Sequence, residues 1–493
     1  MEVLDLKALA EQAVRTHQMG NLAEAERLYM QILNADPGLF GPRYYLGVIR
    51  LQQGRPADAV PFLSEALQIT PGNLGALMHH GMALQASGRA AEALESFEKA
   101  LQIQPNLPEA LYNRGVTLAD LQRYELALES YDRALVVQPE MVSALMNRGI
   151  VLTILGRMDD ALASFDRILV LQPSNIAALN SRGLTLRAMR RPQEAATAYE
   201  RALSLNPGYG DARYNLGVAL LDQQRAGDAL AAFEGVLAER PNDAELFNNR
   251  GVALWNLKRP AEALASFDRA LAIEPQFVEA WGNRGLALND MARHQEAIAS
   301  FDMAISLDPR NAVAWNSRAN VLRDMKNYDA AVESYTKALE IRPHYAEALI
   351  NRGYIHWTLW QYEAGKADVE RGLAIEPDYP YGRGEVLHTR MYSADWNDLA
   401  ERKADLERRV RAGERAVQPF VFQAIAETPE DAQACSRIWA RHKYPELPGA
   451  PHSPEARKSH GKIRIGYLSG EFRQQATAIL MAGLYERHDR EKF

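Results

Sequence analysis

The chain has 493 residues and a nearly balanced charge, with 56 lysines and arginines against 63 aspartates and glutamates, which gives a formal net charge of −7. This balance, without long blocks of like charge, argues against a nucleic-acid-binding surface. No apolar run reaches the roughly 18 residues of a membrane-spanning helix, and the first residues lack the apolar stretch of a secretory signal. The single cysteine, Cys435, rules out a disulfide framework and is typical of a reducing compartment. We therefore expect a soluble, cytoplasmic protein.

A proline recurs every 34 residues through most of the chain. The eleven positions are Pro37, Pro71, Pro105, Pro139, Pro173, Pro207, Pro241, Pro275, Pro309, Pro343 and Pro377. A strict period of this length is the signature of stacked copies of one supersecondary unit, because a single globular core imposes no such spacing. We predict eleven repeats over residues 6–379.

Each repeat is predicted to contain two helices. In the repeat that ends at Pro139, residues 108–121 and 124–138 both carry apolar residues at three- and four-residue intervals. Asn106 and Glu109 have the spacing of a helix N-cap and its capping box. Pro139 should end the second helix, because proline has no N–H to donate and clashes with the preceding turn.

Three further positions recur in step with the prolines and predict close packing of the two helices. The first is a small residue: Gly47, Gly81, Gly115, Gly149, Gly183, Gly217, Gly251, Gly285, Ala319 and Gly353. The second is an alanine: Ala59, Ala93, Ala127, Ala161, Ala195, Ala229, Ala263, Ala297 and Ala331. The third is a large apolar residue: Leu63, Phe97, Tyr131, Phe165, Tyr199, Phe233, Phe267, Phe301 and Tyr335. Glycine inside a helix costs about 1 kcal/mol relative to alanine, so its recurrence indicates that the helices approach too closely for a Cβ atom.

The period and these positions together resemble the tetratricopeptide repeat, over about three quarters of the chain. The resemblance implies an all-α fold, a right-handed superhelix (α-solenoid) whose concave face is lined by the first helix of each repeat. The last repeat departs from the pattern, with Gly365, Val369 and Gly372 at the alanine, aromatic and second alanine positions. Such a departure is expected where a repeat array ends or leads into another domain.

An amide ladder is predicted on the concave face, two residues before each recurrent small residue. Its rungs are Asn113, Asn147, Ser181, Asn215, Asn249, Asn283, Ser317 and Asn351. An asparagine side chain offers one acceptor and two donors, so the ladder could hold the backbone of an extended peptide through many bonds of about 0.5–1.5 kcal/mol each. In the alternative interpretation, the amides cap neighbouring turns or bond to the adjacent repeat.

Two charged rows accompany the ladder. The arginine row, interrupted by Leu216, is Arg114, Arg148, Arg182, Arg250, Arg284, Arg318 and Arg352. The acidic row, on the second helices, is Glu98, Asp132, Asp166, Glu200, Glu234, Asp268 and Asp302. We predict ion pairs between the rows, with recognition of an acidic partner or of nucleic acid by the arginines as weaker alternatives. The eleven histidines, including the adjacent pair His79 and His80, show no metal-ligand spacing, and we identify no catalytic motif.

After residue 379 the period stops and the composition changes. Residues 380–445 are predicted to form a helical linker, with one helix beginning near Pro429, and residues 446–460 a proline-rich loop. Residues 462–472 have the condensed apolar pattern of a buried parallel strand, and residues 474–493 look like the helix that follows it. We therefore predict that residues 461–493 are the first βα unit of an α/β domain.

The ladder, the triplet Ala394-Asp395-Trp396, the pair Pro419-Phe420 and residues 462–493 together resemble the O-linked N-acetylglucosamine transferases, most closely the bacterial members. The resemblance implies that the solenoid recruits protein substrates. It also implies a two-lobed catalytic region that transfers N-acetylglucosamine from UDP-GlcNAc, the donor substrate, to serine or threonine, with no metal or further cofactor. Gln475 stands where the family has an active-site histidine, and an amide cannot take a proton at neutral pH. Because the chain ends at Phe493, early in the first catalytic lobe, we expect it to lack a complete catalytic domain by itself.

Two functions from different classes follow. The chain is either the substrate-recruiting region of a protein glycosyltransferase, or a non-enzymatic scaffold that mediates protein–protein interactions. In both cases the expected partner is a protein or an extended peptide in the concave groove, with no nucleic acid and no membrane, and a homo-oligomer is possible.

Overall fold

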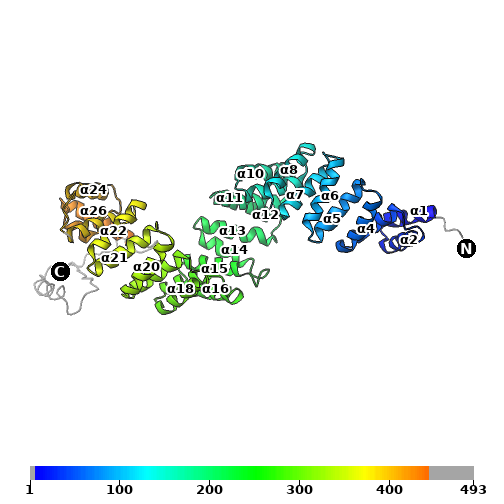
Figure 1. Cartoon of the computed structure of the whole chain (residues 1–493). Coiled ribbons are helices and arrows are strands. Elements are labelled where there is room, and N and C mark those ends of the chain that lie inside the picture. The colour runs from blue at the N-terminus through cyan, green and yellow to red at the C-terminus, as the bar shows by residue number, and fades with distance from the viewer. Residues whose placement is uncertain (1–5, 393, 444–493) are drawn as a thin grey trace, which may run out of the picture. The chain divides into compact units, whose positions relative to one another are not determined.

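A computed structural model describes residues 6–392 and 394–443. Within these ranges the chain forms twenty-six helices and no strand (Figure 1). The chain divides into two compact units, Met1–Ser334 (unit 1) and Tyr335–Phe493 (unit 2). The prediction of an all-α, paired-helix solenoid is confirmed for the described residues.

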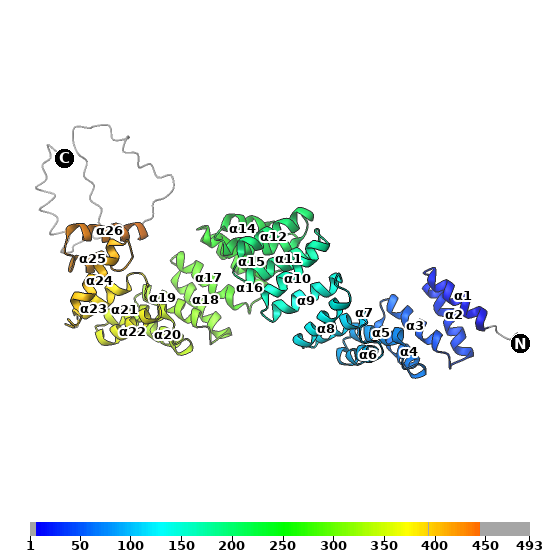
Figure 2. The same cartoon turned by 90° about the horizontal axis from the view of Figure 1, so that it is seen from above.

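Unit 1 consists of consecutive helix pairs, which lie side by side in both views (Figure 2). The first helices are α1 Leu6–Gln18, α3 Phe40–Gln52, α5 Leu74–Ala86, α7 Pro108–Asp120, α9 Val142–Ile154, α11 Ile176–Ala188, α13 Gly210–Asp222, α15 Ala244–Asn256, α17 Val278–Asp290 and α19 Ala312–Asp324. The second helices are α2 Leu22–Ala35, α4 Pro56–Ile69, α6 Ala90–Ile103, α8 Tyr124–Val137, α10 Met158–Leu171, α12 Pro192–Leu205, α14 Ala226–Glu234, α16 Pro260–Ile273, α18 His294–Leu307 and α20 Tyr328–Ile341. The division between the units falls within α20.

The recurrent glycines lie where the two helices of a repeat touch, as the sequence predicts. A Cβ atom added to Gly251 would lie 2.4 Å from Cε1 of Phe267, and one added to Gly115 would lie 2.5 Å from Cε1 of Tyr131. The rings themselves are buried: Phe267 is 0 % exposed and Tyr131 is 1 % exposed. The small residue of the first helix and the ring of the second helix therefore form one contact in each repeat.

The turn inside each repeat uses a left-handed residue at the same position every 34 residues. In four repeats it is a glycine: Gly20, Gly54, Gly88 and Gly156. In the others a residue with a side chain takes the same conformation: Gln122, Arg190, Gln224, Lys258, Ala292, Lys326 and Trp360, with φ between 58° and 62°. A left-handed conformation costs a non-glycine residue about 1–2 kcal/mol, so these seven turns hold local strain.

Ala292→Gly is therefore expected to raise the free energy of unfolding by up to about 1 kcal/mol, since Ala292 is exposed and its methyl group contributes little packing. The matched control is Ala265→Gly, at an exposed position inside α16, which should lower stability by about 1 kcal/mol. Urea denaturation of the two variants measures both changes. Equal losses for the two variants would contradict the assignment of strain to the turn.

The predicted capping box at Asn106 and Glu109 is wrong. Helix α7 begins at Pro108 with Leu107 as its N-cap, and no side chain caps it. Asn106 lies one residue before the capping position. Where an asparagine or aspartate stands at the position of Leu107 in another repeat, it does accept from a backbone N–H three residues on, as Asn73 does from Ala76 and Asp243 from Leu246.

One repeat of unit 1 is irregular. Helix α14 has 9 residues, whereas the other second helices have 14. After it ends, Arg213 of α13 donates to the carbonyl oxygen of Gly235 at 2.9 Å and also to that of Pro207. The arginine thus satisfies backbone acceptors that a longer helix would have used internally.

Unit 2 continues with α21 Ala346–Thr358, α22 Tyr362–Ile375, α23 Gly382–Tyr392, α24 Leu399–Arg411, α25 Pro419–Gln423 and α26 Pro429–Lys443. Its core includes Leu387, Leu406, Phe422 and Cys435. Burial raises the pKa of the Cys435 thiol to about 11, and the thiol donates to the Val417 carbonyl at 3.3 Å. Cys435 is thus a packing residue with no thiolate character at neutral pH.

The altered last repeat has a packing reason. A Cβ atom on Gly365 would lie 2.1 Å from Cδ1 of Trp357, so the alanine of the other repeats would not fit beside this indole. The ring of Trp357 comes from the first helix, whereas the usual aromatic of the second helix is replaced by Val369. The large and small partners have therefore exchanged helices in this repeat.

Unit 2 is expected to lose stability as the pH falls. Arg411 donates to both carboxylate oxygens of Asp431, at 2.8 and 2.7 Å, and lowers its pKa to about 2. Lys366 likewise lowers the pKa of Asp395 to about 2. Because these folded pKa values lie below the value of about 3.9 for a free aspartate, the stabilisation is present above about pH 4 and is lost between about pH 4 and pH 2. Thermal unfolding of Asp431→Asn across this range should show a weaker pH dependence than the parent, and an unchanged dependence would contradict this role.

The predicted loop at 446–460 and the predicted βα unit at 461–493, with Gln475, lie outside the described residues. The eleven-repeat boundaries and the linker range of 380–445 stay predictions. In residues 6–392 and 394–443, none of the helices combines the length and apolar character needed to cross a membrane.

Candidate functional site

The first helices of unit 1 line its inner face. Neighbouring first helices contact one another directly, as α5 does with α7 and α7 with α9, whereas the second helices in the described part of unit 1 make no comparable contacts with each other. Helices on the inside of a curved stack lie closer together than those on the outside. The amide ladder, which the first helices carry, therefore belongs to the inner face.

Four ladder amides bond to the preceding repeat. The Nδ2 atoms of Asn147 and Asn249 donate to the hydroxyls of Tyr112 and Tyr214, at 3.3 and 2.8 Å. Those of Asn215 and Asn283 donate to the side-chain oxygens of Asn180 and Asn248, at 3.0 and 2.9 Å. In each pair the acceptor lies 35 residues before the rung, and we call it the companion residue. The amino groups are thus used in the way that the alternative interpretation expected.

Acidic residues fix the direction of two of these rungs. The Asn248 amide donates to Glu279 at 3.1 Å, so its oxygen must face Asn283, whose amino group then donates. The Tyr214 hydroxyl donates to Glu245 at 3.3 Å and therefore accepts from Asn249. Burial and the Glu245 carboxylate raise the pKa of Tyr214 to about 12, so the hydroxyl keeps its proton.

The rung oxygens are the groups that remain for a ligand. No donor within the described residues hydrogen-bonds to the Oδ1 atoms of Asn147, Asn215, Asn249 or Asn283, and none of these oxygens is a buried, unsatisfied atom. All four rungs are half-buried, as are Asn113, Ser181 and Ser317. Asn351, in unit 2, is only 7 % exposed and is the least accessible rung.

The identity of a rung follows the identity of its companion. Ser181 and Ser317, the two rungs without an amide, stand 35 residues after Met146 and Gly282, which offer no hydrogen-bond acceptor of the same kind. Asn113 follows Met78, and its side chain makes no hydrogen bond to the described residues, so it keeps both donors and acceptor. Sequence reasoning missed this pairing, although the 35-residue spacing would have revealed it.

An apolar row flanks the ladder. Met82, Ile150 and Leu184 are 43 %, 43 % and 41 % exposed. Each lies three residues after a ladder position and therefore on the same helix face. The inner face thus presents hydrogen-bond acceptors beside exposed apolar side chains.

The predicted ion pairs between the charged rows are confirmed. Arg114, Arg148, Arg182, Arg250, Arg284 and Arg318 each pair with the acid 16 residues earlier, on the preceding second helix, at N–O distances between 2.6 and 3.5 Å. Most of them also donate to a serine 16 residues later, as Arg148 does to Ser164 at 2.6 Å. Arg352 pairs instead with Asp368 at 2.7 Å. The row therefore ties neighbouring helices together, and where Leu216 interrupts it, Glu200 makes no ion pair within the described residues.

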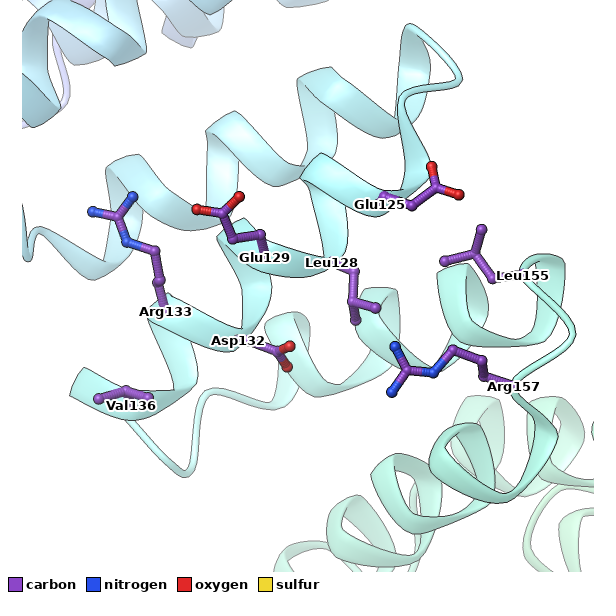
Figure 3. Close-up of a pocket in the computed structure, with 8 residues that line it drawn as sticks. All are labelled: Glu125, Leu128, Glu129, Asp132, Arg133, Val136, Leu155 and Arg157. Atoms are coloured by element: carbon purple, nitrogen blue, oxygen red, sulfur yellow. The ribbon is translucent and has the colours of Figure 1, made fainter.

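A pocket of about 520 Å³ lies on the second-helix side, between α8 and the turn before α10 (Figure 3). Its charged lining residues are largely engaged. Asp132 pairs with Arg148, Arg157 with Asp160, and Arg133 donates to the Pro105 carbonyl. The pocket contains no histidine and no nucleophile, and the described residues hold no group of three or more ligating side chains placed to bind a metal ion.

Comparison with known families identifies the repeats. Models of the tetratricopeptide repeat match residues 18–73, 112–176, 180–244, 220–276 and 248–312, which together exceed half of the chain. Further models of this repeat match residues 81–122, 312–345 and 346–379. The chain belongs to the tetratricopeptide repeat (TPR) family.

Several solved TPR structures are similar to parts of the chain. One is a TPR protein from Parabacteroides merdae, with 21 % identity, a TM-score of 0.42, and coverage of 50 % of this chain and 98 % of that protein. YrrB, described as a TPR protein with an unusual peptide-binding site, has 24 % identity, a TM-score of 0.32, and coverage of 38 % and 95 %. MamA has 24 % identity, a TM-score of 0.31, and coverage of 33 % and 94 %. No curated protein matches the chain.

Proposed function

We propose that the inner face of the TPR array binds an extended polypeptide segment. The observation that carries this proposal is the set of half-buried rung oxygens without an intramolecular donor, beside the exposed apolar row. An extended backbone presents N–H groups at regular intervals, and side chains alternate about it. Acceptors and apolar surface side by side suit both features of such a ligand.

The direction of the rungs gives this binding a specific chemistry. Because the amino groups of Asn249 and Asn283 are occupied by Tyr214 and Asn248, these rungs accept hydrogen bonds and do not donate them. They would therefore take backbone N–H groups of the ligand. Each bond contributes about 0.5–1.5 kcal/mol, so affinity depends on the number of rungs engaged.

This chemistry is tested with a peptide selected against the protein from a random library. Methylation of backbone nitrogens along the peptide should weaken binding about tenfold at each position that donates to a rung, which corresponds to about 1.4 kcal/mol. Fluorescence polarisation of labelled peptides measures the change. A peptide methylated only outside the bound segment is the control, and equal affinity for every methylated peptide would contradict the proposal.

We further propose that the bound polypeptide is the acceptor of a protein glycosyltransferase. The support is the sequence resemblance of the ladder, of Ala394-Asp395-Trp396 and of residues 462–493 to the O-linked N-acetylglucosamine transferases. In this proposal the inner face recruits the protein, and an α/β region that begins near residue 461 uses UDP-GlcNAc. The competing proposal is a non-enzymatic scaffold, which the same inner face supports equally well.

Donor binding separates the two proposals. Calorimetry with UDP-GlcNAc on the longest product encoded in frame with this chain should give a measurable affinity if the glycosyltransferase proposal is right. The same titration with UDP alone distinguishes recognition of the sugar from recognition of the nucleotide. If neither binds while the selected peptide still does, the scaffold proposal stands.

A further inference from the structure

Unit 2 carries a continuous row of exposed aromatic side chains that its own core does not use. The aromatic row consists of Trp360, Tyr362, Tyr392, His388 and Phe420. Consecutive rings are in contact, with centroid distances of 6.1 Å for Trp360–Tyr362, 5.7 Å for Tyr362–Tyr392, 4.8 Å for Tyr392–His388 and 6.4 Å for His388–Phe420. Elements α22, α23 and α25 and the turn before α22 contribute to the row.

The exposure of the row is large for a folded chain. Trp360 and Phe420 are each 77 % exposed, and Tyr392 is 58 % exposed. The neighbours of Phe420 behave differently, since Val421 and Phe422 are buried in the core of unit 2. Contiguous apolar surface of this kind marks an interaction site, and large aromatic residues are typical energetic centres of interfaces.

One end of the row opens into an apolar groove of about 470 Å³. The groove is lined by His388, Met391, Tyr392, Phe420, Val421, Gln423 and Ala424. No lysine, arginine, aspartate or glutamate takes part in the lining. Its surface therefore favours an apolar occupant over a charged one.

We propose that the groove and the aromatic row are the docking surface for residues 478–485 of the same chain. This stretch, Ala-Ile-Leu-Met-Ala-Gly-Leu-Tyr, contains no charged residue and follows the described part of the chain by 34 residues. Its composition matches the uncharged lining of the groove. Burial of such side chains contributes about 25 cal/mol for each Å² removed from water.

The place at which the described chain ends favours this occupant. Helix α26, which leads to residue 444, packs on α24 and α25, and α25 carries Phe420 (Figure 2). The end of α26 is held by a hydrogen bond of 2.9 Å between His442 and the hydroxyl of Tyr381, just before α23. Tyr392, at the other end of α23, is about 16 Å away along the helix at 1.5 Å per residue, which residues 444–477 can span easily.

The test is site-specific photocrosslinking in the full 493-residue chain. Phe420 is replaced by p-benzoylphenylalanine, and the irradiated protein is digested and analysed by mass spectrometry. We expect crosslinks within one chain to the peptide that contains residues 478–485. The matched control carries the same probe at Val136, an 82 % exposed apolar residue of α8, and should give no crosslink to that peptide.

A second variant keeps the proposal falsifiable without altering the groove. Leu480→Asp places a charge in the proposed occupant, and we expect loss of the Phe420 crosslink with an unchanged helical circular dichroism spectrum. Crosslinks only between two copies of the chain would overturn the proposal in favour of a dimer interface. Crosslinks to other segments, or none at all, would also overturn it.

Discussion

Phe267→Ala is expected to lower the free energy of unfolding by about 3–5 kcal/mol, the usual loss for a phenylalanine removed from a core. Phe267 is 0 % exposed and fills the space beside Gly251, in a cluster with Leu254 and Phe233. Because each repeat contacts only its neighbours, the effect should concentrate on α15 and α16 and on the helices next to them. Urea denaturation gives the total loss, and hydrogen exchange gives its location.

The matched control for this prediction is Val136→Ala, because Val136 is 82 % exposed. Its effect should stay within about 0.5 kcal/mol. Gly251→Ala tests the same contact from the other side, since its Cβ atom would overlap the Phe267 ring and overpacking costs about 1–3 kcal/mol. An equal loss of exchange protection in all helices of unit 1 would contradict the local nature of the packing.

Replacement of Asn215, Asn249 and Asn283 by alanine in one protein is expected to weaken peptide binding about 100-fold. Three lost hydrogen bonds of about 1 kcal/mol each give about 3 kcal/mol, and each 1.4 kcal/mol is about a factor of ten in affinity. Stability should fall as well, because the same amides donate to Asn180, Tyr214 and Asn248. Titration with the selected peptide and urea denaturation separate the two effects.

Two control variants complete this test. Asn256→Ala changes an exposed asparagine of α15 outside the ladder and should leave affinity unchanged. Tyr214→Phe removes the acceptor of Asn249 but keeps the rung, and should reduce stability more than affinity. If the triple variant lost stability and bound the peptide as well as the parent does, the ladder would be purely structural.

The repeat architecture was predictable because it depends on positions rather than on distances. The prolines, the small residues and the rings recur at fixed spacing, so each repeat independently supports the same prediction. The contact between Gly251 and Phe267 could be inferred for the same reason. The cap of α7 could not, because Asn106 misses the capping position by one residue and only the local backbone reveals it.

The candidate site was predictable only in part. Sequence periodicity places the ladder on the first helices, but it does not indicate what each amide contacts. The bond from Asn283 to Asn248, and the one from Asn248 to Glu279, depend on how consecutive repeats stack. The same is true of Gly365, whose departure from the pattern is visible in the sequence while its cause, the indole of Trp357, is visible only in the structure.

The pairing of rung and companion has a consequence for how such an array can evolve. Asn249 finds Tyr214 in the repeat before it, whereas Ser181 and Ser317 follow repeats that offer Met146 and Gly282. Excision, duplication or shuffling of a single 34-residue cassette would set some rungs opposite the wrong neighbour and leave their donors unmatched. The order of the copies is therefore itself under selection, even though each copy has the same fold.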